Sequence, residues 1–76
     1  MPLTSLVPGQ RAVVTELSGG KTMRRRLASM GLTVGAEVES VISRGRGPIV
    51  VAVRQTRLAL GRGLAAKVRS EERRLA

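Results

Sequence analysis

The chain of 76 residues contains no cysteine, no histidine and no aromatic residue. Without cysteine it has neither a disulfide nor a thiolate ligand, and without histidine it lacks a principal protein ligand of zinc, copper and iron. Aliphatic side chains must build the core, which is thin because a domain of this size buries only about 60% of the surface exposed by its unfolded chain. The sequence therefore predicts one small domain without a disulfide or a structural metal site.

Aspartate is absent as well, so the acid–base candidates are five glutamates and two lysines. Glu37 and Glu39 stand two residues apart on a predicted strand and share one of its faces. Alternating glutamates on a strand are typical of a solvated face, and a hard cation normally needs more oxygen ligands than two. We therefore expect no enzyme, no catalytic residue and no cofactor, with Glu37 and Glu39 as weak candidates for binding a divalent metal.

Positive charge is abundant: twelve arginines and two lysines face five glutamates, for a formal net charge of +9 at pH 7. This excess attracts anions, including nucleic acids and acidic lipids, whatever the fold. The codon usage of a genome rich in G and C accounts equally well for the many arginines. Nonspecific single-strand binders generally also carry aromatic side chains on which bases stack, and this sequence has none. A specific nucleic-acid partner is therefore not expected.

The first ten residues lack the charged segment and the long apolar run of a signal peptide. The longest mostly apolar stretch, residues 48–53, is far too short to cross a bilayer. We therefore expect a cytoplasmic protein that does not insert into the membrane.

A short helix is predicted over about residues 21–30, and Gly31 is placed to end it in a left-handed conformation from which Leu32 folds back onto the helix. A helix of about ten residues is marginal alone, so its stability must come from docking one apolar stripe. The stripe residues recur at i, i+4 and i+7: Met23, Leu27 and Met30.

Short β-branched segments separated by glycine and proline turns predict the rest of the fold. The strand over residues 36–43 is expected to turn Val38, Ser40 and Ile42 to one face and the two glutamates to the other. The other strands are expected over residues 11–17, 48–54 and 57–60 and from residue 68, with a hairpin tip at 44–47 and one helical turn within 61–67.

This arrangement predicts a mainly β fold, a small and strongly curved antiparallel barrel with one short helix after the first strand. The single domain is expected to span residues 1–70, followed by a charged C-terminal tail over residues 71–76. Exposed strand edges allow two copies to pair, so a homo-oligomer is one expectation.

Four motifs recur in order along nearly the whole chain, with Ala65 and Val68 behind them: L-x-x-L-x-x-G at 3–9, R-L-x-x-M-G-L-x-x-G at 26–35, G-P-I-x-V at 47–51 and R-L-A-L at 57–60. With these motifs in this order, the chain resembles the bacterial ferrous-iron transport protein A family, the FeoA type. The resemblance implies an SH3-like barrel and a cytosolic accessory to the ferrous-iron permease, whose cytoplasmic GTP-binding domain is the implied partner. Related modules occur fused to that permease and at the C-terminus of metal-dependent repressors.

Three departures from the family pattern stand out. Gly61 and Gly63 occupy a short helical turn that in the family often carries charged residues. Val34 stands where the turn before Gly35 usually has proline, so this loop is expected to be more mobile than in relatives. Ser70 stands where an apolar strand residue is expected. These departures bear on the rigidity of the loop before Gly35 and of the C-terminal third of the chain, and they do not change the predicted fold.

The family has no catalytic motif to transfer, so the candidate site is a docking surface. We expect a cationic rim around small apolar contacts, built from the helix edge and two exposed loops. Its candidate residues are Arg24, Arg25, Arg26, Gly31, Leu32, Gly35, Arg44 and Arg46. Two alternatives stay open: a basic small-barrel protein that binds nucleic acid, and a metal-responsive module that uses Glu37 and Glu39.

Overall fold

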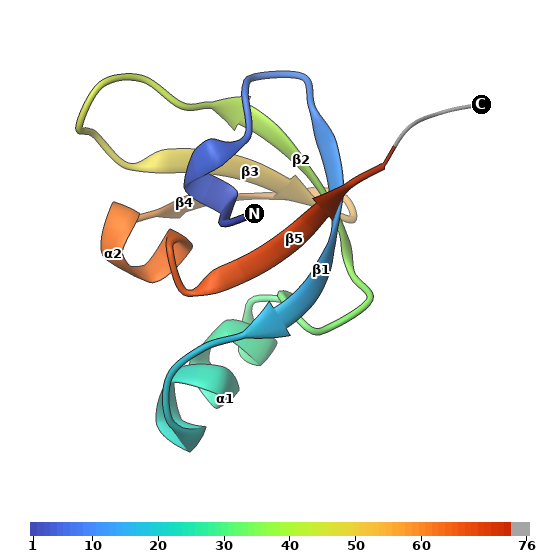
Figure 1. Ribbon diagram of the computed structural model, residues 1–76, viewed down its shortest axis with the longest axis vertical. Coiled ribbons are helices and arrows are strands. Elements are labelled where there is room, and N and C mark those ends of the chain that lie inside the picture. Colours follow the sequence, from blue (N-terminus) through green and yellow to red (C-terminus); the bar gives the residue numbers. More distant parts are fainter. Residues whose placement is uncertain (74–76) are drawn as a thin grey trace.

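The computed structural model describes residues 1–73, which form a single curved antiparallel sheet of five strands in the order β4-β3-β2-β1-β5 (Figure 1). The mainly β fold predicted from the sequence is confirmed, with one short helix after the first strand. The elements are η1 (Leu3–Ser5), β1 (Arg11–Leu17), α1 (Lys21–Ser29), β2 (Glu37–Ile42), β3 (Ile49–Val53), β4 (Thr56–Leu60), α2 (Arg62–Ala65) and β5 (Val68–Glu72).

The two edge strands of the sheet, β4 and β5, are consecutive in the chain and are joined by the short helix α2. The sheet is therefore strongly curled, because so short a connection must bridge its two edges. The short η1 contacts both α2 and β5. Helix α1 extends from the opposite end of the molecule, between β1 and β2 (Figure 1). The interior of the sheet is thus covered by η1 and α2 at one end and by α1 at the other.

Alternation along the strands fills the interior with small aliphatic side chains. On β3, Ile49, Val51 and Val53 point inward and are buried, as the sequence predicts. Each such side chain contributes about 1.5–3 kcal/mol when it is fully buried. The remaining buried hydrophobic residues are Leu3, Leu6, Ala12, Val14, Leu27, Leu32, Val38, Leu60, Ala65 and Val68.

Helix α1 is held by its apolar stripe, because its start has neither a side-chain cap nor an acidic residue in the first turn. Leu27 is fully buried, while Met23 and Met30 are half-buried against the core. The predicted stripe is therefore confirmed. Packing, rather than local stabilisation of the helix start, is what keeps so short a helix folded.

The C-terminus of α1 forms a Schellman motif. Met30 is the C-cap, and Gly31 follows with φ at +88°. The amide of Gly31 donates to the carbonyl of Ala28 at 2.9 Å, and the amide of Leu32 donates to the carbonyl of Leu27 at 3.0 Å. These are the two bonds that define the motif, so the predicted helix stop is confirmed.

The prediction for Ile42 is wrong: its side chain is 45% exposed instead of facing the core with Val38 and Ser40. The cause is a register shift against β3 between Ser40 and Ile42, where Ser40 pairs with Val51 but Ile42 pairs with Val50. An extra residue in one strand breaks the alternation of faces, and a period of two cannot reveal it.

The sheet also continues beyond the predicted domain boundary at residue 70. Strand β5 runs to Glu72, and the amide of Arg73 donates to the carbonyl of Arg11 at 2.9 Å. Of the predicted tail, residues 74–76 lie outside the described residues. Residues 71 and 72 belong to β5 because they pair with Val13 and Ala12 of β1.

Ser70, the polar residue at an expected apolar position, is fully buried and hydrogen-bonded. Its hydroxyl donates to the carbonyl of Met1 at 3.0 Å, and Pro2 bridges to the neighbouring Arg69. A buried hydroxyl with a partner costs little, whereas one without a partner destabilises the fold. The serine is therefore compatible with a rigid β5.

We expect replacement of Gly31 by alanine to destabilise the protein by about 1–2 kcal/mol, because a Cβ disfavours the left-handed conformation. Its Cβ would also lie 3.4 Å from a methyl carbon of Val53. Thermal unfolding followed by circular dichroism measures the effect. Gly63→Ala is the matched control: it lies within α2 with open space around the new methyl group, and should stabilise by roughly 0.5–1 kcal/mol. Equal melting temperatures for Gly31→Ala and the unmodified chain would contradict the assignment.

Candidate docking surfaces

Helix α1 carries four exposed positive charges and no acidic residue. We call Lys21, Arg24, Arg25 and Arg26 the α1 basic surface. Within residues 1–73, none of these four side chains forms a hydrogen bond or an ion pair. Like charges three or four residues apart on a helix repel one another, and cations at a helix start oppose the helix dipole. The folded chain therefore does not require these charges. Lys21 is followed by Arg24 and Arg25 three and four residues on, which lowers the stability of the helix, whereas Arg26 lies in the last turn, where the dipole favours a cation.

The loop between β2 and β3, residues 43–48, holds Arg44 and Arg46, both exposed. A guanidinium nitrogen of Arg62 on α2 donates to the backbone carbonyl of Arg44 at 3.2 Å. This loop is therefore attached to α2, at the end of the molecule opposite to α1 (Figure 1). The arginines of the loop and those of the helix form two separate surfaces rather than the single rim expected from the sequence.

The segment after α1 places its expected docking residues differently. Leu32 is fully buried, so its side chain belongs to the core. The prediction that Leu32 is a docking residue is therefore wrong. The cause is the Schellman motif, which folds this residue back onto Leu27. Gly35 is exposed, and its amide donates to the carbonyl of Val14 at 2.8 Å, which anchors the loop to β1. Val34 between them is 63% exposed.

Glu37 and Glu39 lie on the outer face of β2, and each pairs with an arginine. The carboxylate of Glu39 is 3.2 Å from the side chain of Arg11, and that of Glu37 is 2.8 Å from Arg73. All four side chains are between 41% and 61% exposed, so these ion pairs add little stability. Within the part of the chain that the structure describes, no three acidic residues form a group that could hold a metal.

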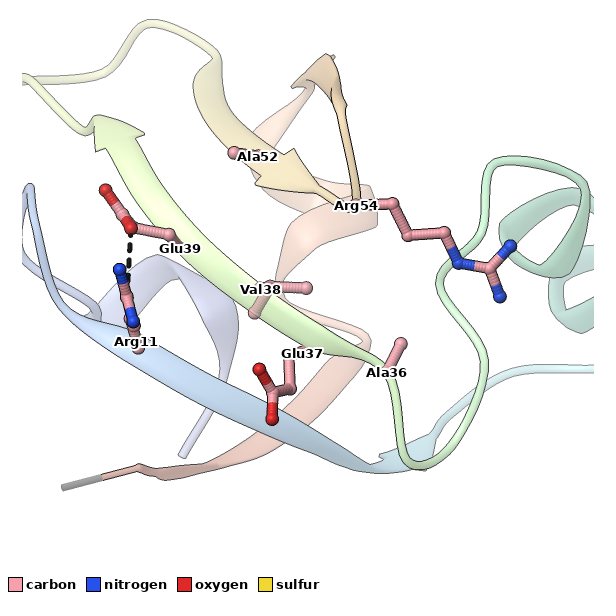
Figure 2. A pocket seen from close by; sticks show the side chains of 7 residues that line it. All are labelled: Arg11, Ala36, Glu37, Val38, Glu39, Ala52 and Arg54. Atoms are coloured by element: carbon pink, nitrogen blue, oxygen red, sulfur yellow. Dashed lines mark hydrogen bonds and ion pairs between the residues drawn. The ribbon is translucent and has the colours of Figure 1, made fainter. Parts of the chain in front are cut away.

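A shallow pocket on the outer face of the sheet, which we call the sheet pocket, has a volume of about 360 Å³ (Figure 2). It forms where Ala36 and Ala52 leave space between longer side chains. Its carboxylates are already paired, as described above. The lining residues are Arg11, Ala36, Glu37, Val38, Glu39, Ala52 and Arg54.

A second hollow, which we call the helix–hairpin groove, lies between the C-terminus of α1 and the β3–β4 hairpin and has a volume of about 380 Å³. Arg54 lines it as well as the sheet pocket. The sequence analysis assigned Arg54 to the strand over residues 48–54 and did not single it out as a site residue. In the structure β3 ends at Val53, and Arg54 begins a two-residue turn where glycine or asparagine is usual. The groove is lined by Ser29, Met30, Gly31, Val53, Arg54, Thr56 and Leu58.

Among residues 1–73, no helix is both long and apolar enough to span a membrane.

The strongly curved five-stranded sheet with its inserted helix is the architecture of SH3-like domains. The family model described as the FeoA domain matches residues 1–72. The chain belongs to the FeoA family, whose members are accessory proteins linked to ferrous iron transport.

Relatives of known structure agree with this assignment. A crystal structure of FeoA described as an iron uptake regulatory protein has a TM-score of 0.91 and 39% sequence identity, covering 95% of this chain and 96% of that one. The zinc-complexed FeoA of Stenotrophomonas maltophilia, described as a prokaryotic SH3 domain protein, has a TM-score of 0.77 and 33% identity, covering 93% and 89%. The Fe(2+) transport protein A of Methanocaldococcus jannaschii is 32% identical over 71 residues, 93% of this chain and 85% of that protein.

Placing an acidic residue at the start of α1 should stabilise the helix. Gly20 is the N-cap, has an extended backbone, and has open space where a Cβ would stand. We expect Gly20→Asp to raise the stability by about 0.5–1 kcal/mol, since the carboxylate caps free amides and opposes the adjacent positive charge. Gly20→Ala, which adds a Cβ but no cap, is the control in thermal unfolding. A gain no larger for Gly20→Asp than for Gly20→Ala would show that the helix start needs no such compensation.

We expect Mn(II) to show no preference for Glu37 and Glu39 over Glu71 and Glu72, an exposed pair on β5. The arginines beside the first pair compete with a cation, and two carboxylates supply few of the oxygen ligands that such ions require. Paramagnetic broadening of the backbone amide signals during an Mn(II) titration measures the preference. Selective, saturable broadening at Glu37 and Glu39 that disappears in the Glu37→Gln, Glu39→Gln double variant would instead support a metal-responsive module.

Proposed function

We propose that this protein is a cytoplasmic accessory of ferrous iron uptake and that it acts by docking the α1 basic surface onto an acidic surface of the permease's cytoplasmic GTP-binding domain. The observation that carries this proposal is the set of four unpaired cations on α1 in a member of a family linked to ferrous iron transport. Lys21 and Arg24 lie in the first turn of α1, where positive charge destabilises the helix, and a complementary partner would account for them.

Two further observations support docking as the mode of action. Glu37 and Glu39, the two glutamates that share a strand face, lie on the exposed outer side of the sheet and are paired with arginines. The zinc-complexed S. maltophilia relative is described as a candidate ferrous iron transport activating factor. A small domain of this kind changes the activity of its partner through the free energy of association.

The α1 basic surface is favoured over the β2–β3 loop as the docking site because of what surrounds each. The backbone carbonyl of Arg44 accepts the bond from Arg62, so the backbone of that loop has an internal role, although the side chains of Arg44 and Arg46 form no hydrogen bond or ion pair within residues 1–73. The α1 cations have no internal role, and the helix that carries them is fixed to the core through Leu27. A rigid element presents charge at a lower entropic cost on binding than a loop does.

The Arg24→Gln, Arg25→Gln double variant should bind the purified GTP-binding domain of the permease about tenfold more weakly, mainly through slower association. Loss of two charges at a complementary interface reduces electrostatic steering, and glutamine preserves helix propensity. Biolayer interferometry at two salt concentrations measures both rates, and thermal unfolding should show no loss of stability.

The matched control is the Arg44→Gln, Arg46→Gln double variant, which removes the same charge from the opposite end of the molecule. Its affinity should stay within about twofold of that of the unmodified chain. If the loop variant alone loses binding, the docking surface is the β2–β3 loop, and if neither variant loses binding, the electrostatic proposal fails.

The net charge of +9 supports a second candidate, a protein that binds nucleic acid. Contact with several phosphates predicts that log affinity for an oligonucleotide falls steeply and linearly with log salt concentration. We expect negligible binding of single- and double-stranded oligonucleotides near physiological ionic strength, because the described chain offers no aromatic side chain for base stacking. Fluorescence anisotropy across a salt series distinguishes the two candidates.

A further inference from the structure

The turn between β3 and β4 contains a backbone conformation that its side chain disfavours. Val53 pairs with Thr56, so the turn consists of Arg54 and Gln55 alone. Arg54 has φ at +57° and is the one residue other than glycine with a positive φ among residues 1–73. Glycine or asparagine adopts this conformation at a lower cost. An arginine here therefore makes the hairpin less stable than it would be with glycine.

Among the described residues, the guanidinium of Arg54 forms no polar contact that would offset the free-energy cost of the positive φ. Within the described chain it forms neither a hydrogen bond nor an ion pair. Figure 2 shows its side chain extending from the end of β3, away from Glu37 and Glu39 and toward the segment that joins α1 to β2. Those two carboxylates are paired with other arginines. The fold thus projects an unpaired cation from a strained turn.

The helix–hairpin groove beside this cation is suited to an apolar group. Met30 and Leu58 line it as half-buried side chains, and Val53 lies buried beneath them. None of its lining residues is acidic. The hydroxyl of Ser29 donates to the carbonyl of Arg26, so Thr56 is the lining residue with an uncommitted hydroxyl. The groove therefore combines apolar side chains with hydroxyl and backbone polar atoms, and Arg54 gives it one positive charge.

We propose that the helix–hairpin groove binds a short segment of a partner protein in which an acidic residue is flanked by apolar residues. Its carboxylate pairs with the Arg54 guanidinium, and an apolar side chain packs against Met30 and Leu58. A guanidinium recognises a carboxylate through two parallel hydrogen bonds, which accounts for an arginine at a position where it is disfavoured. This recognition differs from that of proline-rich peptides, which needs aromatic side chains that the chain lacks.

The proposal rests on the proposed function in one respect, namely that the partner carrying this segment is the permease domain. The groove adjoins the C-terminus of α1, since Ser29, Met30 and Gly31 line it. A partner that contacts the α1 basic surface can therefore also reach Arg54. The groove adds selectivity for a sequence to the general attraction of the helix charges for an acidic surface.

Binding of two matched peptides to the full chain tests the proposal without the permease. The probes are acetyl-Leu-Glu-Leu-amide and acetyl-Leu-Gln-Leu-amide, which differ in one charge. We expect the first to shift the backbone amide NMR signals of Gly31, Arg54 and Thr56 and to bind at least fivefold more tightly than the second. Equal affinities, or shifts confined to other elements, would overturn the proposal.

Arg54→Gly separates recognition from structure. Glycine relieves the strained φ, so the melting temperature should stay the same or rise while the fivefold preference for the glutamate peptide disappears. Arg57→Gln, which removes one positive charge from the adjacent β4, is the control and should leave the preference intact. A melting temperature lowered by several degrees in Arg54→Gly would assign Arg54 a structural role and overturn the proposal.

Inorganic phosphate distinguishes a peptide groove from a simple anion site. We expect phosphate at the same concentration to shift Arg54 less than the glutamate peptide does and to leave Gly31 unaffected. An equal or larger response to phosphate would overturn the proposal. Peptide binding with no association between the chain and the permease domain would retain the groove and remove the proposed function, whereas the reverse outcome would remove the groove alone.

Discussion

The docking of α1 onto the sheet is the interaction on which both candidate surfaces depend. The helix has an unfavourable start, with no cap and adjacent positive charges, and it persists because Leu27 is fully buried and two methionines pack beside it. The Schellman motif at Gly31 then directs the chain back toward the sheet. The orientation of the α1 basic surface and one wall of the helix–hairpin groove therefore follow from this single packing contact.

Some charged side chains of this protein bind a partner within the fold, and others bind none. Glu37 and Glu39 each form an ion pair with an arginine on the outer face of the sheet, and the side chain of Arg62 attaches α2 to the β2–β3 loop. By contrast, the α1 cations and Arg54 are unpaired within residues 1–73, as are other surface cations such as Arg57 and Arg69. What distinguishes Lys21 and Arg24 in the first turn of α1, and Arg54 with its positive φ, is that each occupies a position where a different residue type would make the fold more stable. Stability sacrificed at one end of a small domain is the pattern that binding surfaces show.

Sequence reasoning located the elements of this fold because local rules determine most of them. The stripe through Leu27 and the glycine after Met30 identified α1 and its end, and alternation identified the inward face of β3. It failed at Ile42, because a register shift arises from pairing with another strand. It also could not show that Ser70 is bonded to Met1, a contact between residues far apart in the chain.

The candidate site was less predictable than the fold, because the distance between two surface charges depends on tertiary structure. The arginines of α1 and of the β2–β3 loop looked equivalent in the sequence, yet they lie at opposite ends of the molecule. Arg54 was assigned to a strand from the sequence, and both its place in the turn and its unpaired guanidinium emerged only with the hairpin in place.

The bond from Arg62 to the carbonyl of Arg44 has a consequence for the β2–β3 loop. The loop is attached partway along its length as well as at both ends, so it samples fewer conformations than a free hairpin of the same size. A ligand at this loop would therefore immobilise less of the chain on binding. A substitution that removed the guanidinium of Arg62 would lengthen the freely moving span without changing a single residue of the loop.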